Sequence, residues 1–197
     1  RQTMTDHIDV RDALPYDEFV RDYLNEQRPV HIKNAFPQWK ALGKWSPEFF
    51  KERYGDREVT VAGERTTMGA YMERVANSSP ENPAPYLREL CVRAFAPELG
   101  DDLSPFVAYA LPNWLRGVYA SSSLDHHLNR AAEVELFIGG PGTKLERRKG
   151  ETDPTFGGLQ GALISGFADL HYDPTACPVM LCQIYGKKAW TVHSPED

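Results

Sequence analysis

The sequence predicts an α+β fold in which N-terminal helices and short strands pack on an antiparallel β-sandwich or barrel. Helix and strand signals alternate over the first third of the chain, and from Glu133 onward apolar residues form strand-like runs joined by short turns. The 197 residues, of which 41% are hydrophobic, are enough to bury a sizeable core. Strands that follow a helical N-terminal half are typical of the α+β class.

The first helix is expected over residues 15–27, PYDEFVRDYLNEQ, because Pro15 suits a first helical turn. Its apolar residues recur with helical spacing and would share one face: Phe19, Val20, Tyr23 and Leu24. Residues 28–36, RPVHIKNAF, predict a short strand in which Val30 and Ile32 alternate with polar neighbours.

Two further helices carry capping signals. Residues 46–55, SPEFFKERYG, begin with Ser46 as the expected N-cap, followed by a proline, and end on a glycine. Residues 57–63, REVTVAG, predict the next strand, and Thr66 or Thr67 would cap a helix that runs to about residue 77.

The middle of the chain, residues 78–128, is less regular and predicts short helices and turns after the proline-rich stretch SSPENPAP. We expect its aromatic residues to serve core and surface packing rather than ligand contact: Phe95, Phe106, Tyr109, Trp114 and Tyr119.

The C-terminal third has four strand-like runs. They are VELFIGG at 134–140, ALISGFADLHYD at 162–173, PVMLCQIYG at 178–186 and KAWTVHS at 188–194. A charged and then glycine-rich stretch follows the first run, so we expect an external loop inserted at about residues 144–167.

The amino-acid composition limits the classes of binding partner and the cell compartment that we expect. A net charge of −6 disfavours a nucleic-acid partner, and no apolar run approaches the ~20 residues of a membrane span. Three irregularly spaced cysteines and the lack of a signal-peptide pattern favour an intracellular, cytoplasmic protein, with the nucleus left open. The chain lacks an initiator methionine and ends directly after a strand-like run, so we expect a piece of a longer protein.

His171 and Asp173 are the strongest candidates for chemistry. Residues i and i+2 of a strand leave on the same face, so this imidazole and this carboxylate would converge. Together they could supply two of the three ligands of a 2-His-1-carboxylate Fe(II) site. The simpler interpretation is a histidine hydrogen-bonded to a carboxylate in a half-buried strand.

The stretch "LHYDP…LCQIYGKKAWTVHSPED" resembles the JmjC-type, cupin-like Fe(II)- and 2-oxoglutarate-dependent oxygenases. In that family an H-x-D strand precedes a Q-[IV]-x-G-x-K strand, and "ELFIGGPGT" resembles the strand before the metal motif. The resemblance implies a double-stranded β-helix (cupin, or jelly-roll) barrel whose first strands occupy residues 131–197. Residues 1–130 would form the mixed helical and strand region before it.

The resemblance also implies roles for single residues. His171 and Asp173 match the catalytic metal ligands, and Lys188 matches the lysine that pairs with the distal carboxylate of 2-oxoglutarate. Period-2 alternation allows only one of Lys187 and Lys188 to face inward, and the motif spacing favours Lys188. With Fe(II), 2-oxoglutarate and O2 as cofactor and cosubstrates, such a protein would hydroxylate a protein side chain or a small molecule.

The sequence departs from the family pattern in three ways. Ala168 stands where a hydroxyl residue often contacts the cosubstrate, at a cost of ~1 kcal/mol. The insertion at 144–167 is the second departure. The third is the missing second metal histidine, because His193, His126 and His127 are poorly placed for that role. We therefore expect these residues alone to bind iron poorly and to be inactive.

Two alternatives to an oxygenase remain open. One is a catalytically inactive cupin-like binding module, or a truncated fragment, and a histidine on a later strand would discriminate against it. The other is a zinc or manganese cupin, with Cys177 and Cys182 as soft ligands, although buried packing suits these cysteines better. The substrate would be selected by loops and by the irregular middle, and a homodimer is compatible with the resemblance.

Overall fold

The computed structural model describes residues 8–105, 107–110, 134–143, 178–190 and 192. The chain divides into two compact units. The first comprises Arg1–Gly43, Asp101–Ala132 and Met180–Asp197, and the second comprises Lys44–Gly100 and Glu133–Val179. The described elements are helices and two-stranded sheets, as an α+β fold requires.

The first unit contains a parallel strand pair joined by a helix. Strand β1 (Asp9–Asp12) lies beside β2 (Val30–Lys33), and the connection contains α1 (Tyr16–Phe19) and the π-helical segment η1 (Val20–Leu24). The helix and the second strand were predicted from sequence and are confirmed, although the helix ends at Leu24 rather than near residue 27.

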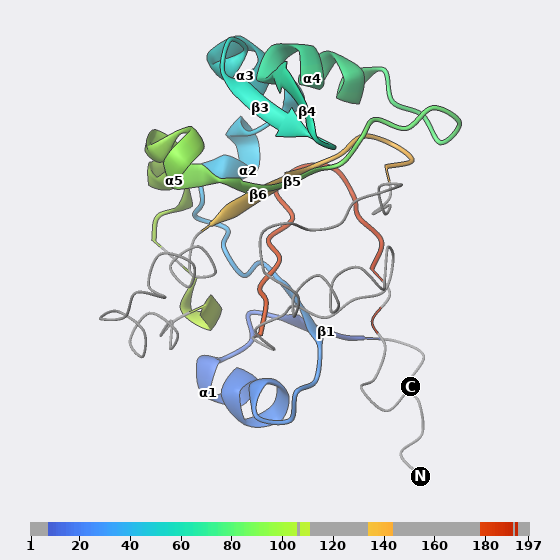
Figure 1. The fold of residues 1–197 in the computed structure, drawn as a ribbon. Helices are drawn as coiled ribbons and strands as arrows, with labels where there is room; N and C mark the ends of the chain where they lie inside the picture. Colours follow the sequence, from blue (N-terminus) through green and yellow to red (C-terminus); the bar gives the residue numbers. More distant parts are fainter. Residues whose placement is uncertain (1–7, 106, 111–133, 144–177, 191, 193–197) are drawn as a thin grey trace, which may run out of the picture. The chain divides into compact units, whose positions relative to one another are not determined.

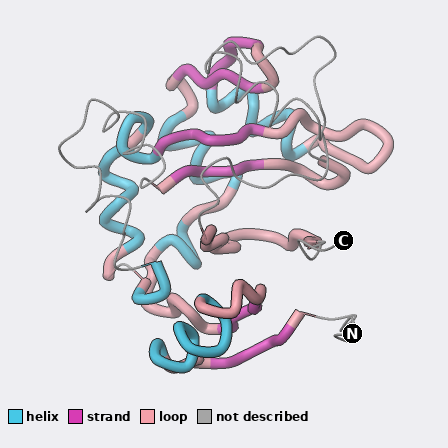
Figure 2. Tube along the Cα trace, turned by 60° about the horizontal axis from the view of Figure 1, so that its bottom comes forward, coloured by secondary structure: helices cyan, strands magenta, loops and turns pink. Residues whose placement is uncertain are grey.

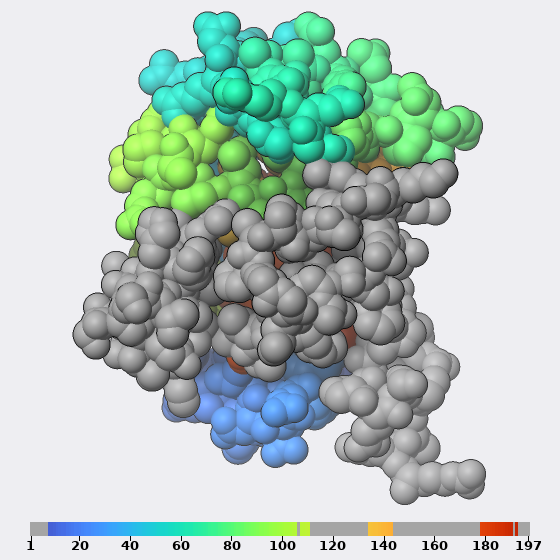
Figure 3. All heavy atoms as spheres, in the orientation of Figure 1, coloured from blue at the N-terminus to red at the C-terminus, as the bar shows by residue number. Residues whose placement is uncertain are grey.

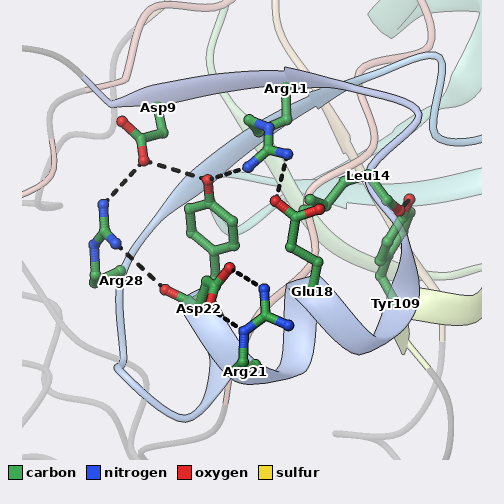
Figure 4. A network of polar contacts seen from close by, with 9 residues as sticks. Asp9, Arg11, Leu14, Glu18, Arg21, Asp22, Arg28 and Tyr109 are labelled. Atoms are coloured by element: carbon green, nitrogen blue, oxygen red, sulfur yellow. Dashed lines mark hydrogen bonds and ion pairs between the residues drawn. The ribbon is translucent and has the colours of Figure 1, made fainter.

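A polar network around Tyr23 ties this helix to β1 (Figure 4). The Tyr23 ring is buried, and its hydroxyl accepts a hydrogen bond from Arg11 at 3.1 Å and donates to Asp9 at 3.3 Å. Arg11 also pairs with Glu18, and Arg28 pairs with Asp9 at 2.9 Å. Exposed ion pairs contribute only about 0–1 kcal/mol each, so the buried ring contributes most to the cohesion of this network.

The second unit combines two helices, a hairpin and a second strand pair. Figure 2 shows the second strand pair of this unit as two adjacent magenta strands. Figure 3 shows the side chains of the two helices and of the hairpin gathered together. The bounds are α3 (Pro47–Tyr54), β3 (Glu58–Val61), β4 (Glu64–Thr67), α4 (Met68–Ala76), β5 (Leu87–Cys91) and β6 (Glu135–Ile138). Four shorter segments complete the described elements: α2 (Ala41–Lys44), α5 (Val92–Phe95) and the 3₁₀ segments η2 (Pro97–Leu103) and η3 (Ala108–Ala110).

The predicted helix caps are present. The Ser46 hydroxyl accepts the Phe49 N–H at 3.2 Å, and the Thr67 hydroxyl accepts the Ala70 N–H at 3.2 Å. Each cap satisfies a backbone donor that the first helical turn leaves without an intrahelical partner. The structure therefore chooses Thr67 over Thr66 as the cap of α4.

The Tyr71 side chain joins α4 to the antiparallel β5–β6 pair. Its hydroxyl donates to the Ile138 carbonyl at 2.6 Å, lies 2.9 Å from the Pro85 carbonyl and accepts the Leu87 N–H at 3.2 Å. The side chain is fully buried, and burial raises the pKa of Tyr71 to about 12. One neutral hydroxyl thus satisfies backbone groups of both strands inside the core.

Strand predictions were less accurate than helix predictions. Strand β5 was missed because its sequence LRELC contains two charged residues and a bulge, with Glu89 at φ 58°. Residues 178–190 form no β-ladder with other described residues, so the strands predicted at 178–186 and 188–194 stay a prediction. The predicted strand at 162–173 lies outside the described residues.

The helices that the structure describes are all too short or too polar to cross a membrane.

Replacing Tyr71 by phenylalanine tests the hydroxyl that joins α4 to the strands. We expect Tyr71→Phe to lower the free energy of unfolding by about 1–3 kcal/mol, because the buried Leu87 N–H loses its acceptor. Tyr185→Phe is the matched control, because Tyr185 is 60% exposed and its change should stay within about 0.5 kcal/mol. Urea titrations measure both values, and equal stabilities of the two variants would contradict the assignment.

The raised pKa of Tyr71 predicts sensitivity to alkali. Its folded-state pKa of about 12 exceeds the ordinary value of 10.0, so its contribution is complete below pH 10 and is lost as pH rises toward 12. The loss should amount to about 2–3 kcal/mol. Unfolding free energies measured from pH 8 to 12 should fall less steeply for Tyr71→Phe than for the unaltered protein, and parallel curves would show that folding does not raise the pKa of Tyr71.

Candidate functional site

Lys188 is the only one of the three predicted site residues that the structure describes. His171 and Asp173 lie outside the described residues, as does Ala168, so their proximity to one another stays a prediction. Within the described ranges, no group of three or more histidine, cysteine, aspartate or glutamate residues could hold a metal ion.

The Lys188 side chain lies over an aromatic ring. Its ammonium nitrogen is 4.1 Å from the centroid of the Trp190 ring. Lys188 is exposed and Trp190 is 49% exposed, so both side chains face solvent. An ammonium that carries three N–H donors fits a carboxylate of a dicarboxylate ligand.

The chain bends just before Lys188. The Gln183 side-chain amide donates to the Tyr185 carbonyl at 2.7 Å, and Gly186 follows at φ +72°. A positive φ is strained for residues with a Cβ atom, and this explains the glycine of the "QIYGKK" stretch. The bend also interrupts the period-2 alternation from which the inward direction of Lys188 was predicted.

Cys182 resembles a packing residue more than a metal ligand. It is half-buried, and desolvation raises the pKa of its thiol to about 11. Metal binding requires the thiolate, which burial of this kind disfavours. Cys177, the other soft ligand of the zinc alternative, lies outside the described residues.

The segment that follows β6 is anchored within the second unit. After β6, the Thr143 hydroxyl donates to the Ala84 carbonyl at 2.7 Å and accepts the Gly140 N–H at 3.0 Å. The Ser78 hydroxyl donates to the Pro141 carbonyl at 2.7 Å and accepts the Ala84 N–H at 2.7 Å. Two of these bonds, from Thr143 to Ala84 and from Ser78 to Pro141, fasten residues 139–143 to residues 78–84, and the other two brace each segment internally.

Two glycines permit this close approach. A Cβ atom on Gly140 would lie 2.4 Å from the Cβ of Ser78. Gly142 has φ +79°, and a Cβ atom there would lie 2.5 Å from the Cα of Pro80. The glycine-rich end of the "ELFIGGPGT" strand therefore has a packing reason.

Two aromatic residues of the middle region have packing contacts, as predicted. The Tyr109 hydroxyl donates to the Leu14 carbonyl, and its ring lies edge-on to Phe19 at 5.2 Å. Phe95 is buried and its ring lies 5.5 Å from that of Tyr54. Trp190 was the functional candidate that the sequence did not single out, although its i+2 spacing from Lys188 is a readable signal.

Residues 15–197 match the sequence model of the cupin-like domain. The chain is also 46% identical over 44 residues to human "Bifunctional peptidase and (3S)-lysyl hydroxylase JMJD7", which is 22% of this chain and 14% of that protein. It is 38% identical over 45 residues to "JmjC domain-containing protein E" of Dictyostelium discoideum, which is 23% of this chain and 13% of that protein. The aligned stretches thus cover a small part of either relative.

Gly142→Ala should destabilise the segment that leads from β6 toward residue 144. An alanine there is strained at φ +79° and meets the Pro80 backbone, so we expect a loss of at least about 1–2 kcal/mol in unfolding free energy. Gly100→Ala is the control, since a Cβ atom at Gly100 meets nothing within 4 Å. Thermal unfolding compares the two, and equal midpoints would contradict the tight packing of this turn.

Proposed function

The chain belongs to the JmjC-like cupin family, and on that premise we propose that the protein is an Fe(II)- and 2-oxoglutarate-dependent oxygenase that hydroxylates a protein side chain or a small molecule. The family generally uses this metal and this cosubstrate. The observation that carries the proposal is the accessible Lys188 ammonium, at the motif position where the family has its cosubstrate lysine.

Iron would be held by the His171 imidazole and the Asp173 carboxylate. This donor set fits Fe(II), because sites of this class take two imidazoles and one carboxylate and leave positions open for ligands. The second histidine would come from another strand of the barrel in the intact protein. Bound Fe(II), together with 2-oxoglutarate and O2, supplies the oxidation of a substrate C–H bond.

Lys188 would bind the distal carboxylate of 2-oxoglutarate and so fix the direction in which the cosubstrate enters. A charge-assisted hydrogen bond of this kind contributes about 1.5–3 kcal/mol. Ala168 would leave a cosubstrate oxygen without a hydroxyl donor, so the affinity depends more heavily on Lys188. Orientation of the cosubstrate by the protein lowers the entropic part of the barrier.

The finer architecture belongs to the same proposal. Residues 131–197 would supply the first strands of a double-stranded β-helix, with residues 1–130 packed beside it and an inserted loop at 144–167. Residues 180–184 show strand-like alternation, because Met180, Cys182 and Ile184 are less exposed than the residues between them. We propose that other strands of the barrel complete the ladder there.

A lysine side chain is the first substrate to test. The printed name of the human relative includes a (3S)-lysyl hydroxylase activity, and that activity belongs to that protein. The net charge of −6 on this chain would attract a lysine-rich peptide at long range. Cytoplasmic location and a homodimer are further proposals of the same account.

An inactive cupin-like binding module is the second candidate. Ala168 favours it, because a lost cosubstrate contact costs such a module nothing. The two candidates differ in whether the intact protein binds Fe(II) and 2-oxoglutarate together.

Anaerobic addition of Fe(II) and 2-oxoglutarate to the intact protein tests the proposal. We expect a visible metal-to-ligand charge-transfer band that is lost in His171→Ala, because the imidazole would hold the metal. The absence of a band in the folded protein would favour the binding module.

Lys188→Ala should weaken 2-oxoglutarate binding about 10- to 100-fold, which corresponds to the loss of one charge-assisted hydrogen bond. Lys187→Ala is the matched control and should change the affinity less than about twofold, since the neighbouring lysine is expected to face solvent. Calorimetric titration under anaerobic conditions measures both affinities. The reverse ranking would assign the role to Lys187 instead.

A further inference from the structure

Strand β5 has a bulge that lies opposite an exposed aromatic residue of β6. The antiparallel register places two residues of β5, Arg88 and Glu89, opposite the single residue Phe137. The flanking pairs are Leu87 with Ile138 and Leu90 with Leu136. Phe137 is 44% exposed, and Glu89 is exposed as well. The bulge therefore brings a carboxylate and an aromatic ring to neighbouring positions of this strand pair.

Glu89 adopts a backbone conformation that costs stability. Its φ of 58° lies in the left-handed region, where a residue with a Cβ atom is strained. Bulges with a left-handed residue usually have glycine there, and asparagine also tolerates this region better than glutamate does. Because Glu89 is exposed, packing gives no reason for a glutamate at this position. Strained residues of this kind are found most often at functional sites.

The charge around Glu89 is negative. Within the part of the chain that the structure describes, no hydrogen bond or ion pair involves the Glu89 carboxylate, so the adjacent Arg88 does not neutralise it by direct contact. Strands β5 and β6 together carry two carboxylates, Glu89 and Glu135, and one guanidinium, that of Arg88. The whole chain has a net charge of −6. A cation is therefore the complementary ligand for this position.

The Phe137 ring adds an apolar surface beside this charge. Its centroid lies 6.2 Å from that of the Tyr86 ring, so two aromatic side chains lie together here. A lysine side chain combines a flexible four-carbon stem with an ammonium group. The stem fits an aromatic surface, and the ammonium fits a carboxylate. An uncharged apolar side chain or an anionic one would match only part of this surface.

We propose that Glu89 is a specificity-determining residue that binds the ammonium group of a substrate lysine side chain, while the Phe137 ring packs against the carbon stem of that lysine. This inference rests on the proposed function, because it assigns the class of substrate that the oxygenase accepts. In that account β6 would be the barrel strand before the metal strand, and its partner β5 would belong to the same wall. Glu89 selects the substrate and takes no part in the oxidation.

The binding test uses the intact protein loaded with Mn²⁺ and 2-oxoglutarate. A pentaalanine peptide with capped ends and a central lysine is titrated in a calorimeter, and the same peptide with central norleucine is the control. Norleucine keeps the carbon stem and lacks the ammonium. We expect the lysine peptide to bind at least about 5-fold more tightly. Equal affinities would overturn the inference, because no ammonium would then be recognised.

Glu89→Asp and Glu89→Asn are a matched pair of variants. Aspartate and asparagine have nearly the same size and both tolerate the left-handed region, but only aspartate carries a charge. Glu89→Asn should raise the Kd of the lysine peptide about 3- to 10-fold, whereas Glu89→Asp should stay within about threefold of the unaltered protein. Arg88→Gln removes a neighbouring positive charge and should leave this Kd unchanged or lower it. Equal affinities of the aspartate and asparagine variants would overturn the role of the Glu89 carboxylate.

Glu89→Gly tests whether the carboxylate is held at a cost in stability. Glycine accepts a positive φ without strain, so the midpoint of thermal unfolding should rise by about 2–4 °C. The lysine peptide should bind to this variant as weakly as to Glu89→Asn. A lower midpoint would overturn the inference, because stability alone would then account for Glu89.

The outcomes distinguish this inference from the proposed function. If the Glu89 variants bind the lysine peptide like the unaltered protein while the charge-transfer band forms, the role of Glu89 is wrong and the oxygenase proposal stands. If the band does not form and the lysine peptide still depends on Glu89, the oxygenase proposal fails and the recognition of an ammonium belongs to a binding module.

Discussion

The second unit depends on one buried hydroxyl. Tyr71 lies on α4, yet its hydroxyl contacts three backbone groups outside that helix. They are the Leu87 N–H in β5, the Ile138 carbonyl in β6 and the Pro85 carbonyl just before β5. A buried backbone group without a partner is costly, so the helix and the two strands must keep this arrangement together. The position of β6 then fixes the turn at residues 139–143, where Ser78 and Thr143 complete the attachment. Strand β6 and the turn after it therefore have a defined place in the second unit.

The sequence correctly predicted those elements whose stability depends on residues close together in the chain. Ser46 and Thr67 were recognisable as caps, because a hydroxyl that accepts a backbone N–H three residues later needs no information from the rest of the chain. The alternation around Val30 and Ile32 likewise reported a half-buried strand. Strand β5 could not be read in this way, because its pairing with β6 joins residues far apart in sequence and its Glu89 bulge breaks the alternation.

At the candidate site, too, the sequence predicted the motif residues but not their geometry. Family membership was legible in the "HYD" and "QIYGKK" stretches, and the match over residues 15–197 confirms it. The bend at Gly186 and the indole under Lys188 depend on backbone dihedrals and side-chain direction, which no motif specifies. The strands predicted over 178–190 needed neighbouring strands that the described residues do not supply, and periodicity alone cannot provide a ladder partner. His171 and Asp173 remain a prediction from sequence and family.

A crystal structure of the intact protein with Mn²⁺ and 2-oxoglutarate tests the central claim most directly. The account predicts one metal ion about 2 Å from both an imidazole nitrogen of His171 and a carboxylate oxygen of Asp173, the coordination distance typical of such ligands. It also predicts the distal carboxylate of the cosubstrate within hydrogen-bond distance of the Lys188 ammonium. A metal bound elsewhere, or side chains 171 and 173 directed to opposite faces of their strand, would contradict it.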